Sequence, residues 1–347
     1  MSHSDNIYSA ALAALGWSPF FEDQLTPEEE ALTPMRIATV HRARLTAVAP
    51  DGVGPDGPVR LQLQHLASTS DYAVGDWVLV EPDTRLLVRR LDRKALLERH
   101  SEDSRRAQLI AANIDTLFIV TSCNDDLNPA RLERYLALAN EAGTTPVIVL
   151  TKADKVDDPA PFCAQAAELQ RGLEVVALNA KAPDAAQILA PWCGAGQTVA
   201  LVGSSGVGKS SLLNTLSGKS ADEGQATGSI READAKGRHT TTSRSLHPVQ
   251  GGGWAIDTPG MRSLQVSHTA TGLDMLFAEI TELAPQCRFR DCTHAHEPGC
   301  AVQAAVADGT LDPARLQRWR KLQDENRANT PVATGPRGNK ITRGKRR

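Results

Sequence analysis

GSSGVGKS, at residues 203–210, lies between the apolar stretch TVALV (198–202) and the amphipathic stretch SSLLNTL (210–216). It fits the pattern G-x-x-x-x-G-K-[ST], in which glycines let backbone N–H groups surround phosphate oxygens at the start of a helix. Lys209 is expected to contact the β- and γ-phosphates, and the Ser210 hydroxyl to ligate Mg²⁺. The predicted phosphate-binding residues are Gly203, Ser204, Ser205, Gly206, Val207, Gly208, Lys209, Ser210 and Ser211.

The sequence around this loop, from about residue 110 to 264, alternates between apolar strands and amphipathic helices. Strands are predicted in DTLFIV (115–120), TPVIVLTKAD (145–154), LEVVALNAK (173–181) and GGWAIDTPG (252–260). Helices are predicted in ARLERYLALANEAG (130–143) and PFCAQAAELQRG (161–172). Fully apolar strands that alternate with helices indicate a mainly parallel sheet with helices on both faces, and hence an α/β P-loop domain.

A second motif, Asp257-Thr258-Pro259-Gly260, follows the strand WAI. An aspartate at the end of a strand parallel to the loop strand can hold the magnesium shell. The Gly260 N–H can meet the γ-phosphate because glycine has no side chain in the way. Alone, this tetrapeptide is only a good turn sequence; together with the loop it is interpreted as the second metal and phosphate motif.

A third motif, Thr151-Lys152-Ala153-Asp154, resembles the N-K-x-D motif with which GTPases select guanine. The Asp154 carboxylate would accept hydrogen bonds from guanine N1–H and the 2-amino group, which adenine cannot supply. The Lys152 stem would pack along the base, and Thr151 replaces the usual asparagine. Asn179-Ala180-Lys181, after the next strand, stands where GTPases place a backbone N–H against guanine O6, although this tripeptide is weak evidence alone.

The order of these motifs differs from that of ordinary GTPases, in which the guanine motif comes last. Here residues 151–154 precede the phosphate loop at 203–210 and the D-T-P-G motif at 257–260. This order indicates a circular permutation, which can preserve the packed elements because the termini of a domain usually lie close together. The chain that leaves Gly260 therefore continues directly into the C-terminal part.

The segment GSIREADAKGRHTTTSRSL (228–246) is polar and weakly periodic, as expected of a switch that orders and disorders with the nucleotide; a plain surface loop is the alternative. Its three threonines, 240–242, offer hydroxyls for Mg²⁺, and the sequence does not choose among them. Met261 stands where many signalling GTPases carry the glutamine that orients the attacking water. We hypothesise that His239 takes this catalytic role, because it can accept a proton near neutral pH.

A cluster of sulfur and imidazole donors lies near the C-terminus, with the spacing Cys287-x4-Cys292-x-His294-x5-Cys300. Three thiolates and one imidazole suit tetrahedral Zn²⁺, and four protein ligands make such a site structural. Disulfides are the alternative, but three cysteines leave one unpaired. His296 could replace His294, which we prefer as the fourth ligand.

Residues 35–100 contain short alternating strands in MRIATVHRARLTAVA (35–49), VRLQLQHLA (59–67) and DWVLVEP (76–82). Several short strands separated by Gly- and Pro-rich turns favour a small β-barrel. A basic face on this barrel is one interpretation, and solvated strand edges are the other. The residues concerned are Arg42, Arg44, Arg89, Arg90, Arg93 and Lys94.

The charge of the chain is distributed unevenly, although the net charge is only -3. The segment from Pro313 to Arg347 is strongly basic, and the remainder is acidic. A basic tail on an acidic body indicates contact with a polyanion or, equally well, a solubilising tail. Residues 323–347 lack apolar content towards their end and are expected to be disordered.

The composition excludes several classes of protein. A hydrophobic content of 41% excludes a disordered chain. No apolar run is long enough for a transmembrane helix, and the N-terminus lacks the pattern of a secretion signal. We therefore expect a cytoplasmic protein with reduced thiols, no membrane partner and a monomeric state.

In this combination and order, the motifs resemble those of the ribosome small-subunit-dependent GTPase family, over about residues 35–319. The resemblance implies an OB-fold barrel, a circularly permuted GTPase domain and a C-terminal zinc domain. It also implies action late in maturation of the small ribosomal subunit, which stimulates GTP hydrolysis. The family's switch histidine matches His239, and its zinc ligands match Cys287, Cys292, His294 and Cys300.

Domain boundaries follow from these interpretations: an extension (1–34) of unknown role, the barrel (35–100), the permuted GTPase domain (101–264), a helical zinc domain (265–322) and a basic tail (323–347). The predicted partners are GTP, GDP, the small ribosomal subunit and its rRNA, with Mg²⁺ and one structural Zn²⁺ as cofactors. The barrel and the basic C-terminal region would supply sequence-independent attraction to RNA phosphates. The alternatives are an RNA-binding scaffold with a structural nucleotide and a P-loop enzyme that phosphorylates a metabolite; Lys152-Ala153-Asp154 argues against the latter.

Overall fold

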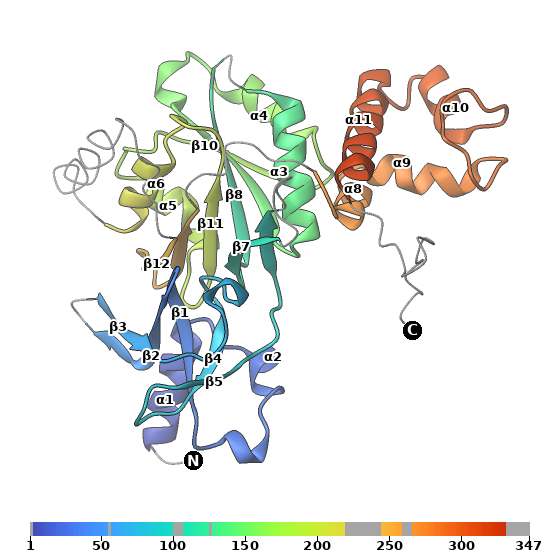
Figure 1. Cartoon of the computed structure of the whole chain (residues 1–347). Helices are drawn as coiled ribbons and strands as arrows, with labels where there is room; N and C mark the ends of the chain where they lie inside the picture. The colour runs from blue at the N-terminus through green and yellow to red at the C-terminus, as the bar shows by residue number, and fades with distance from the viewer. Residues whose placement is uncertain are drawn as a thin grey trace, which may run out of the picture.

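The computed structural model describes residues 3–54, 57–99, 107–124, 127–218, 244–258 and 266–330. Figure 1 shows a β-rich unit at the N-terminal end, a central sheet flanked by helices, and a helical C-terminal unit to one side. Among the described residues, no helix has the length and apolar character needed to cross a membrane. The predicted switch residue His239 and the predicted phosphate contact Gly260 lie outside the described residues.

The core of the central unit is a parallel sheet, as predicted, in the order β10-β9-β8-β11-β13. Each neighbouring pair in this order is parallel, and β8, β11 and most of β9 are fully buried. Unbroken apolar runs produce such strands because helices cover both faces. The strands are β8 (Thr116–Ser122), β9 (Thr145–Thr151), β10 (Glu174–Ala177), β11 (Thr198–Val202) and β13 (Trp254–Asp257).

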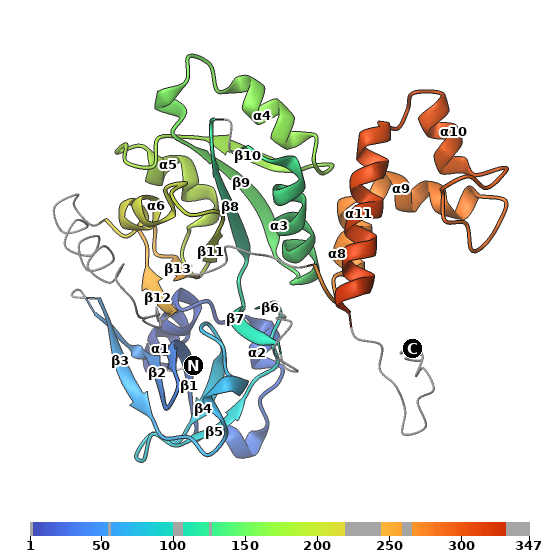
Figure 2. The same cartoon turned by 45° about the horizontal axis from the view of Figure 1, so that its top comes forward.

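Helices pack on both faces of this sheet, so alternate residues of β8 enter different cores. Leu117 and Ile119 join the cluster that includes α3, whereas Phe118 and Val120 join the one that includes α5 and α6. Figure 2 shows the strands fanned between α3 on one side and α5 and α6 on the other. The helices are α3 (Pro129–Glu141), α4 (Ala160–Ala167), α5 (Ala185–Leu189) and α6 (Lys209–Leu216), with 3-10 turns η3 (Ala153–Lys155) and η4 (Ala190–Trp192).

Helix α3 illustrates how local sequence sets the element boundaries. The Asn128 side chain accepts a hydrogen bond from the Arg131 N–H at 3.0 Å, and Pro129 occupies the first helical turn, where its missing N–H costs nothing. The chain leaves the helix through Gly143, whose φ of +73° suits glycine. The helix therefore ends at Glu141, two residues before the glycine at which the sequence predicts its end.

The strand β12 (Ser245–Pro248) is not predicted from the sequence, and it makes the sheet mixed at one edge. It pairs antiparallel with β13 and touches β1 at the register pair Thr39 and Ser245. The central sheet therefore continues into the N-terminal strands rather than ending at the domain border.

Five strands form the predicted small barrel. β1 pairs with β2 and β4, β2 pairs with β3, and β4 pairs with β5. A parallel bridge between Gln64 and Leu86 joins the end of β3 to the start of β5 and completes the circuit. The strands are β1 (Thr33–His41), β2 (Arg44–Gly54), β3 (Gly57–Leu63), β4 (Trp77–Val80) and β5 (Leu87–Arg90), with the 3-10 turn η2 (Thr69–Asp71).

The N-terminal extension, to which the sequence assigns no role, packs against both the barrel and the central sheet. It contains α1 (His3–Ala14), α2 (Pro19–Glu22) and η1 (Pro27–Glu29). Trp17 meets Trp77 of the barrel edge-on, with ring centroids 4.8 Å apart, and Trp254 of β13 donates its indole N–H to the Ala14 carbonyl at 2.8 Å. The extension thus joins the two units.

Arg36 of β1 is a second connection at this junction, and it is only 1% exposed. Its guanidinium donates to the Leu15 carbonyl at 2.5 Å, to the Thr198 hydroxyl at 2.8 Å and to the Asn113 carbonyl at 3.3 Å. Burial lowers the pKa of Arg36 to about 10, and the nearby carboxylates of Asp115 and Asp76 partly offset this effect. One buried cation therefore links the extension, the barrel and the sheet.

The predicted basic face of the barrel needs correction, because three of its cations are neutralised. Arg89 pairs with Glu29 at 2.6 Å, Arg93 with Asp76 at 2.6 Å and Lys94 with Asp115 at 2.7 Å. Each partner lies far away in the sequence or in another element, so alternation along a strand could not reveal it.

Arg42 and Arg44, in contrast, are exposed at the β1–β2 turn and form no ion pair within the described ranges. Arg90, the sixth predicted residue, is half-buried, donates to the Leu91 carbonyl at 3.2 Å and also has no ion pair among the described residues.

A hairpin of β6 (Leu96–Arg99) and β7 (Gln108–Ala112) connects the barrel to the central sheet. The predicted boundary near residue 100 falls inside this hairpin. Gly75 lies against it with a φ of +94°, and a Cβ there would be 2.2 Å from the Ala112 carbonyl oxygen. Only glycine permits this close approach of the two backbones.

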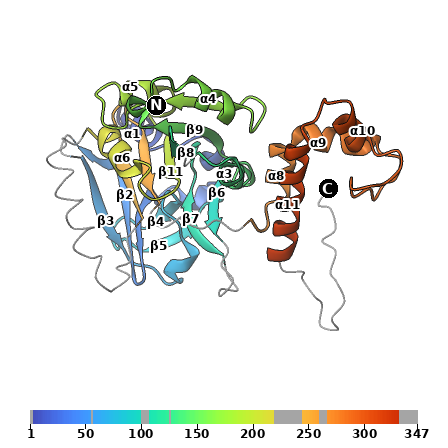
Figure 3. The same cartoon turned by 90° about the horizontal axis from the view of Figure 1, so that it is seen from above.

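The C-terminal unit is helical, as predicted, and stands beside α3 (Figure 3). Its helix α8 packs on α3, and the Gly272 Cα approaches the helix so closely that a Cβ would be 2.1 Å from the Ala137 carbonyl oxygen. The last helix continues beyond residue 323, the predicted start of the basic tail. The elements are α8 (Ala270–Leu276), α9 (Ala278–Leu283), η5 (Ala284–Gln286), α10 (Ala301–Ala307) and α11 (Pro313–Asn329).

Buried charges join α11 to α3. Glu133 is fully buried, and its Oε1 accepts hydrogen bonds from Arg315 and Arg318, each at 2.8 Å. Arg315 also pairs with Glu279 at 2.7 Å and stacks over the Phe277 ring, 4.1 Å from its centroid. Because a buried charge without its partner is costly, this cluster fixes the C-terminal unit on the sheet domain.

Replacing Glu133 tests this cluster. Glu133→Ala leaves Arg318 without a carboxylate and Arg315 with Glu279 alone. We expect a loss of roughly 3–5 kcal/mol in the free energy of unfolding, measured by urea denaturation. Glu282→Ala is the matched control, because it removes another ion pair between the same two units, that of Glu282 with Arg171. The Glu282 side chain is 59% exposed. The control should lose about 1 kcal/mol at most; equal losses in both variants would contradict the role of Glu133.

Candidate nucleotide and metal sites

The three nucleotide motifs meet at the carboxyl edge of the parallel sheet. β9 ends at Thr151, β11 ends at Val202 and β13 ends at Asp257, each directly at the start of its motif. Parallel strands place their carboxyl ends at the same edge, where ligands of open α/β sheets bind. The reversed order of the motifs along the chain therefore does not separate them in space.

The phosphate-binding loop joins β11 to α6 with the geometry that its glycines predict. Gly203 has a φ of +139°, and a Cβ there would be 2.1 Å from the Val120 carbonyl oxygen. Gly208 precedes the helix with a φ of +99°. The Lys209 ammonium lies over the loop and donates to the carbonyls of Gly203 at 2.8 Å and Ser204 at 2.5 Å. The lysine is thus held at the position from which it can reach phosphate oxygens.

Thr151 connects the guanine motif directly to the phosphate loop. Its buried hydroxyl oxygen lies 2.5 Å from the Val207 carbonyl oxygen and 3.0 Å from that of Thr121. A hydroxyl has a single hydrogen, so it donates to one carbonyl at a time. The threonine that replaces the expected asparagine therefore still bridges the two motifs.

The remainder of the guanine motif turns outward from Thr151. Lys152 adopts a left-handed conformation with a φ of +57°, and the 3-10 turn that follows carries Asp154. The Asp154 carboxylate is at the surface, 3.3 Å from the Lys155 ammonium, and Ala153 donates its N–H to the Leu178 carbonyl at 3.3 Å. This conformation leaves the carboxylate accessible to a base.

The loop at Asn179-Ala180-Lys181 is fixed beside the same site. Thr215 of α6 donates its hydroxyl hydrogen to the Ala180 carbonyl at 2.8 Å, and the Asn179 side chain accepts from the Lys181 N–H at 3.0 Å. The helix that follows the phosphate loop therefore also positions this tripeptide, which the sequence alone could not assign.

The D-T-P-G motif is described only at its first two residues. Asp257 pairs in register with Ser245 of β12 and with Leu201 of β11. The buried hydroxyl of Thr258 donates to the Leu201 carbonyl at 2.5 Å. Asp257 thus lies one strand away from the phosphate loop.

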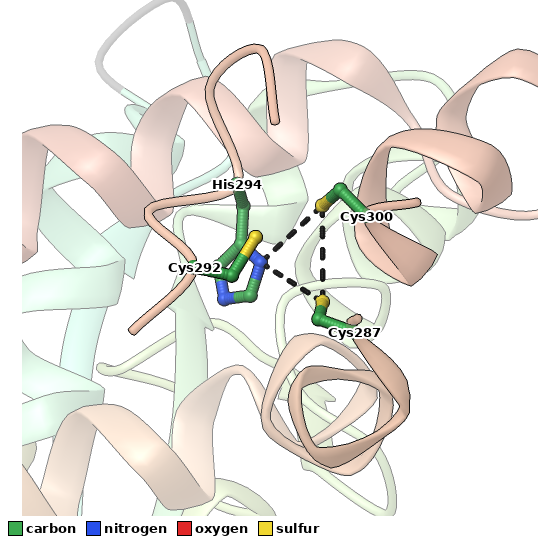
Figure 4. Close-up of side chains that lie close together, drawn as sticks. All are labelled: Cys287, Cys292, His294 and Cys300. Atoms are coloured by element: carbon green, nitrogen blue, oxygen red, sulfur yellow. Dashed lines mark hydrogen bonds between the residues drawn. The ribbon is translucent and has the colours of Figure 1, made fainter. Parts of the chain in front are cut away.

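The Cys/His cluster is assembled as the sequence predicts. The ligand atoms of Cys287, Cys292, His294 and Cys300 all lie within 4.8 Å of one another, and none of the cysteines is in a disulfide (Figure 4). His294 Nδ1 is 3.5 Å from the sulfurs of Cys287 and Cys300, which are 3.8 Å apart. A tetrahedral site with Zn–S bonds of about 2.3 Å requires sulfurs about 3.8 Å apart. The donor set is compatible with zinc.

Neighbouring groups hold His294 in place. Its φ is +59°, and its carbonyl accepts hydrogen bonds from Gln303 at 2.5 Å and from the Arg320 guanidinium. Burial lowers the pKa of His294, which favours the neutral imidazole that a metal requires. His296, the alternative ligand, lies outside the cluster and is exposed.

A sequence model of the RsgA GTPase family matches residues 90–267. The small ribosomal subunit biogenesis GTPase RsgA of Mesorhizobium japonicum is 65% identical, over 98% of this chain and 97% of its own length. This chain belongs to the RsgA GTPase family. RsgA 2 of Vibrio vulnificus is 48% identical, over 92% of this chain and 88% of its own length.

Solved structures agree on the fold. The crystal structure of YjeQ from Thermotoga maritima has a TM-score of 0.59 and 24% identity, and covers 85% of this chain and 98% of its own. YloQ, a circularly permuted GTPase, also has a TM-score of 0.59, with 23% identity over 89% of this chain and 100% of its own. The permuted GTPase fold predicted from the motif order is confirmed, and the protein is a GTPase that uses Mg²⁺ with GTP.

Removing the Thr151 hydroxyl tests its bridging role. Thr151→Val keeps the shape but leaves the Val207 carbonyl without its donor, so we expect GDP and GTP to bind about tenfold more weakly by calorimetry, or roughly 1.4 kcal/mol. Thr121→Val is the matched control, since it removes a neighbouring buried hydroxyl that has no hydrogen-bond partner among the described residues. Thr151→Ser should bind like the native protein. Unchanged affinity in Thr151→Val would refute the role.

Proposed function

We propose that this GTPase binds the small ribosomal subunit in the cytoplasm and hydrolyses GTP as a checkpoint in late subunit maturation. The observation that carries the proposal is the Thr151–Val207 contact, which joins the proposed guanine motif to the phosphate loop. The chain shares 65% identity with a small ribosomal subunit biogenesis GTPase over nearly its whole length. We further propose that it works as a monomer.

The mechanism assigns a role to each part of the site. Backbone N–H groups of residues 203–211, with the positive end of α6, bind the phosphates, and Lys209 neutralises charge on the β- and γ-oxygens. Ser210 and Asp257 would hold the magnesium shell. Asp154 accepts the guanine N–H groups, so ATP would leave this carboxylate unpaired and bind weakly.

Intrinsic hydrolysis is expected to be slow, because Met261 cannot orient the attacking water. We propose His239 as the residue that does so once the subunit has ordered the switch, and Gly260 as a γ-phosphate contact. After hydrolysis the γ-phosphate contacts are lost and the protein leaves the subunit. GTP therefore limits how long the protein remains bound.

RNA contact is proposed at the barrel, which we assign to the OB-fold, and at the C-terminal region. The exposed arginines 42 and 44 supply positive charge at the β1–β2 end of the barrel. Such charge gives sequence-independent attraction to RNA phosphates that weakens with salt. The predicted domain limits of 35–100, 101–264 and 265–322 remain our proposal for the three units.

The experiment that tests this function compares hydrolysis of GTP and ATP, with and without purified small ribosomal subunits. We expect slow hydrolysis of GTP alone, strong stimulation by subunits, and little hydrolysis of ATP. Asp154→Asn should lose guanine selectivity, whereas Asp157→Asn, at a nearby exposed carboxylate, should not. His239→Ala should lose the stimulation and keep GTP binding. Subunit binding that is indifferent to nucleotide would instead favour a scaffold.

We also propose that the Cys/His cluster binds one structural zinc ion, which would order a unit with a small core of its own. Cys292→Ser should lower bound zinc, measured by mass spectrometry, from about one ion per chain to a small fraction, and should lower the melting temperature. Cys163→Ser is the control, because Cys163 is half-buried and lies outside the cluster. Equal zinc content in both variants would argue against the site.

A further inference from the structure

A cavity of about 710 Å³ lies where the barrel meets the β6–β7 hairpin and the start of β12. The β1–β2 turn contributes His41 and Arg42, and the chain around η2 contributes Ser68, Thr69 and Ser70. Thr69 donates its hydroxyl hydrogen to the Arg42 carbonyl at 3.0 Å, so these two walls are joined. The volume falls in the range of small-molecule and nucleotide sites.

The lining of this cavity is positively charged. Arg42 and Arg244 face it together with imidazole, hydroxyl and amide groups, and no carboxylate of the described residues is part of the lining. Two other cavities of about 360 and 370 Å³ differ, because both mix arginines with glutamates. The cation-rich lining therefore suits an anionic ligand.

Arg244 is half-buried and lacks a full set of acceptors among the described residues. It donates to the Leu109 carbonyl at 3.2 Å, but its Nε is buried without a hydrogen-bond partner in the part of the chain that the structure describes. Burial lowers the pKa of Arg244, and the positive charge of Arg99 nearby lowers it further. An anion beside Arg244 would relieve both the desolvation and the repulsion.

The other lining groups suit a nucleobase. Gln108 is exposed at the rim and offers both an amide donor and an acceptor, and the hydroxyls of Ser68 and Ser70 are 2.8 Å apart. Tyr72, which is 8% exposed, is also part of the lining. Exposed Arg44 lies on the same turn as Arg42 but is not part of the lining.

We propose that this cavity binds one nucleotide of single-stranded RNA, its phosphate paired with Arg42 and Arg244 and its base beside Tyr72 and Gln108. A base in duplex RNA is stacked within the helix and cannot enter such a cavity. The proposal rests on the RNA binding proposed above and adds a defined site to it.

The cavity is also connected to the GTP site. Ser245, the residue after Arg244, pairs in register with Asp257 of β13 and with Thr39 of β1. RNA held by Arg244 would therefore lie one residue before the strand that pairs with β13, which ends at the proposed magnesium aspartate. If that contact differs between nucleotide states, RNA occupancy changes the affinity for GTP by linkage.

The test uses the full-length protein with a non-hydrolysable GTP analogue and a labelled single-stranded RNA of about 12 nucleotides. Arg42→Glu should weaken RNA binding, followed by fluorescence anisotropy, by about tenfold or more, because it places a carboxylate in the cavity. Arg44→Glu is the matched control, with the same charge change two residues away, and should weaken binding by about threefold at most. Arg244→Gln should weaken RNA binding as Arg42→Glu does, and thermal unfolding checks that this variant is folded. Duplex RNA should bind the native protein more weakly than single-stranded RNA does.

Each alternative outcome gives a clear answer. Equal weakening by Arg42→Glu and Arg44→Glu would indicate diffuse charge and overturn the cavity. The proposed cavity site would also be overturned if Arg42→Glu bound RNA and small subunits as tightly as the native protein does. Displacement of the RNA by AMP at equal concentration would assign the cavity to free mononucleotides instead. If the native protein binds neither the RNA nor small ribosomal subunits, the proposed function itself is wrong.

Discussion

The parallel alignment of β8, β9, β11 and β13 is the constraint on which the nucleotide site depends. Each strand is buried on both faces, so its direction and register are fixed by packing, and each chemical motif begins where a strand ends. The position of the strand ends in space therefore brings the motifs together, whatever their order along the chain. The three motifs of the permuted chain therefore share one edge of the sheet, and the Thr151 hydroxyl connects two of them.

The parallel sheet, the phosphate loop and the Cys/His cluster were predictable from sequence alone, because these rest on short-range patterns. The cluster spans only residues 287–300, and apolar runs mark the strands. The sequence could not reveal the role of the N-terminal extension, the strand β12 or the neutralised arginines. These depend on partners far apart in the chain, such as Glu29 with Arg89 and Arg36 with Thr198. The glycine at which the chain leaves α3, Gly143, was predictable from the sequence. The buried Nε of Arg244 was not.

Two buried arginines join the three units in different ways. Arg36 binds neutral acceptors, two carbonyls and a hydroxyl, and so depends on backbone positions at the barrel junction. Arg315 binds the carboxylates of Glu133 and Glu279, and so depends on charge at the C-terminal junction. Hydrogen bonds to carbonyls resist salt and acid better than ion pairs do. The C-terminal junction is therefore the more sensitive of the two to solution conditions.

The Glu325 carboxylate makes two contacts, which limit where the chain can be truncated. Its carboxylate pairs with Arg134 of α3 at 2.5 Å and accepts the Val266 N–H at 3.1 Å, at the entry to the C-terminal unit. Asn326 in the next position accepts from the Thr269 N–H at 3.1 Å. The final turns of α11 thus clamp the first residues of their own unit. A shortened chain that stops at residue 322, without the basic terminus, would lose this clamp, so trimming should begin after Thr330.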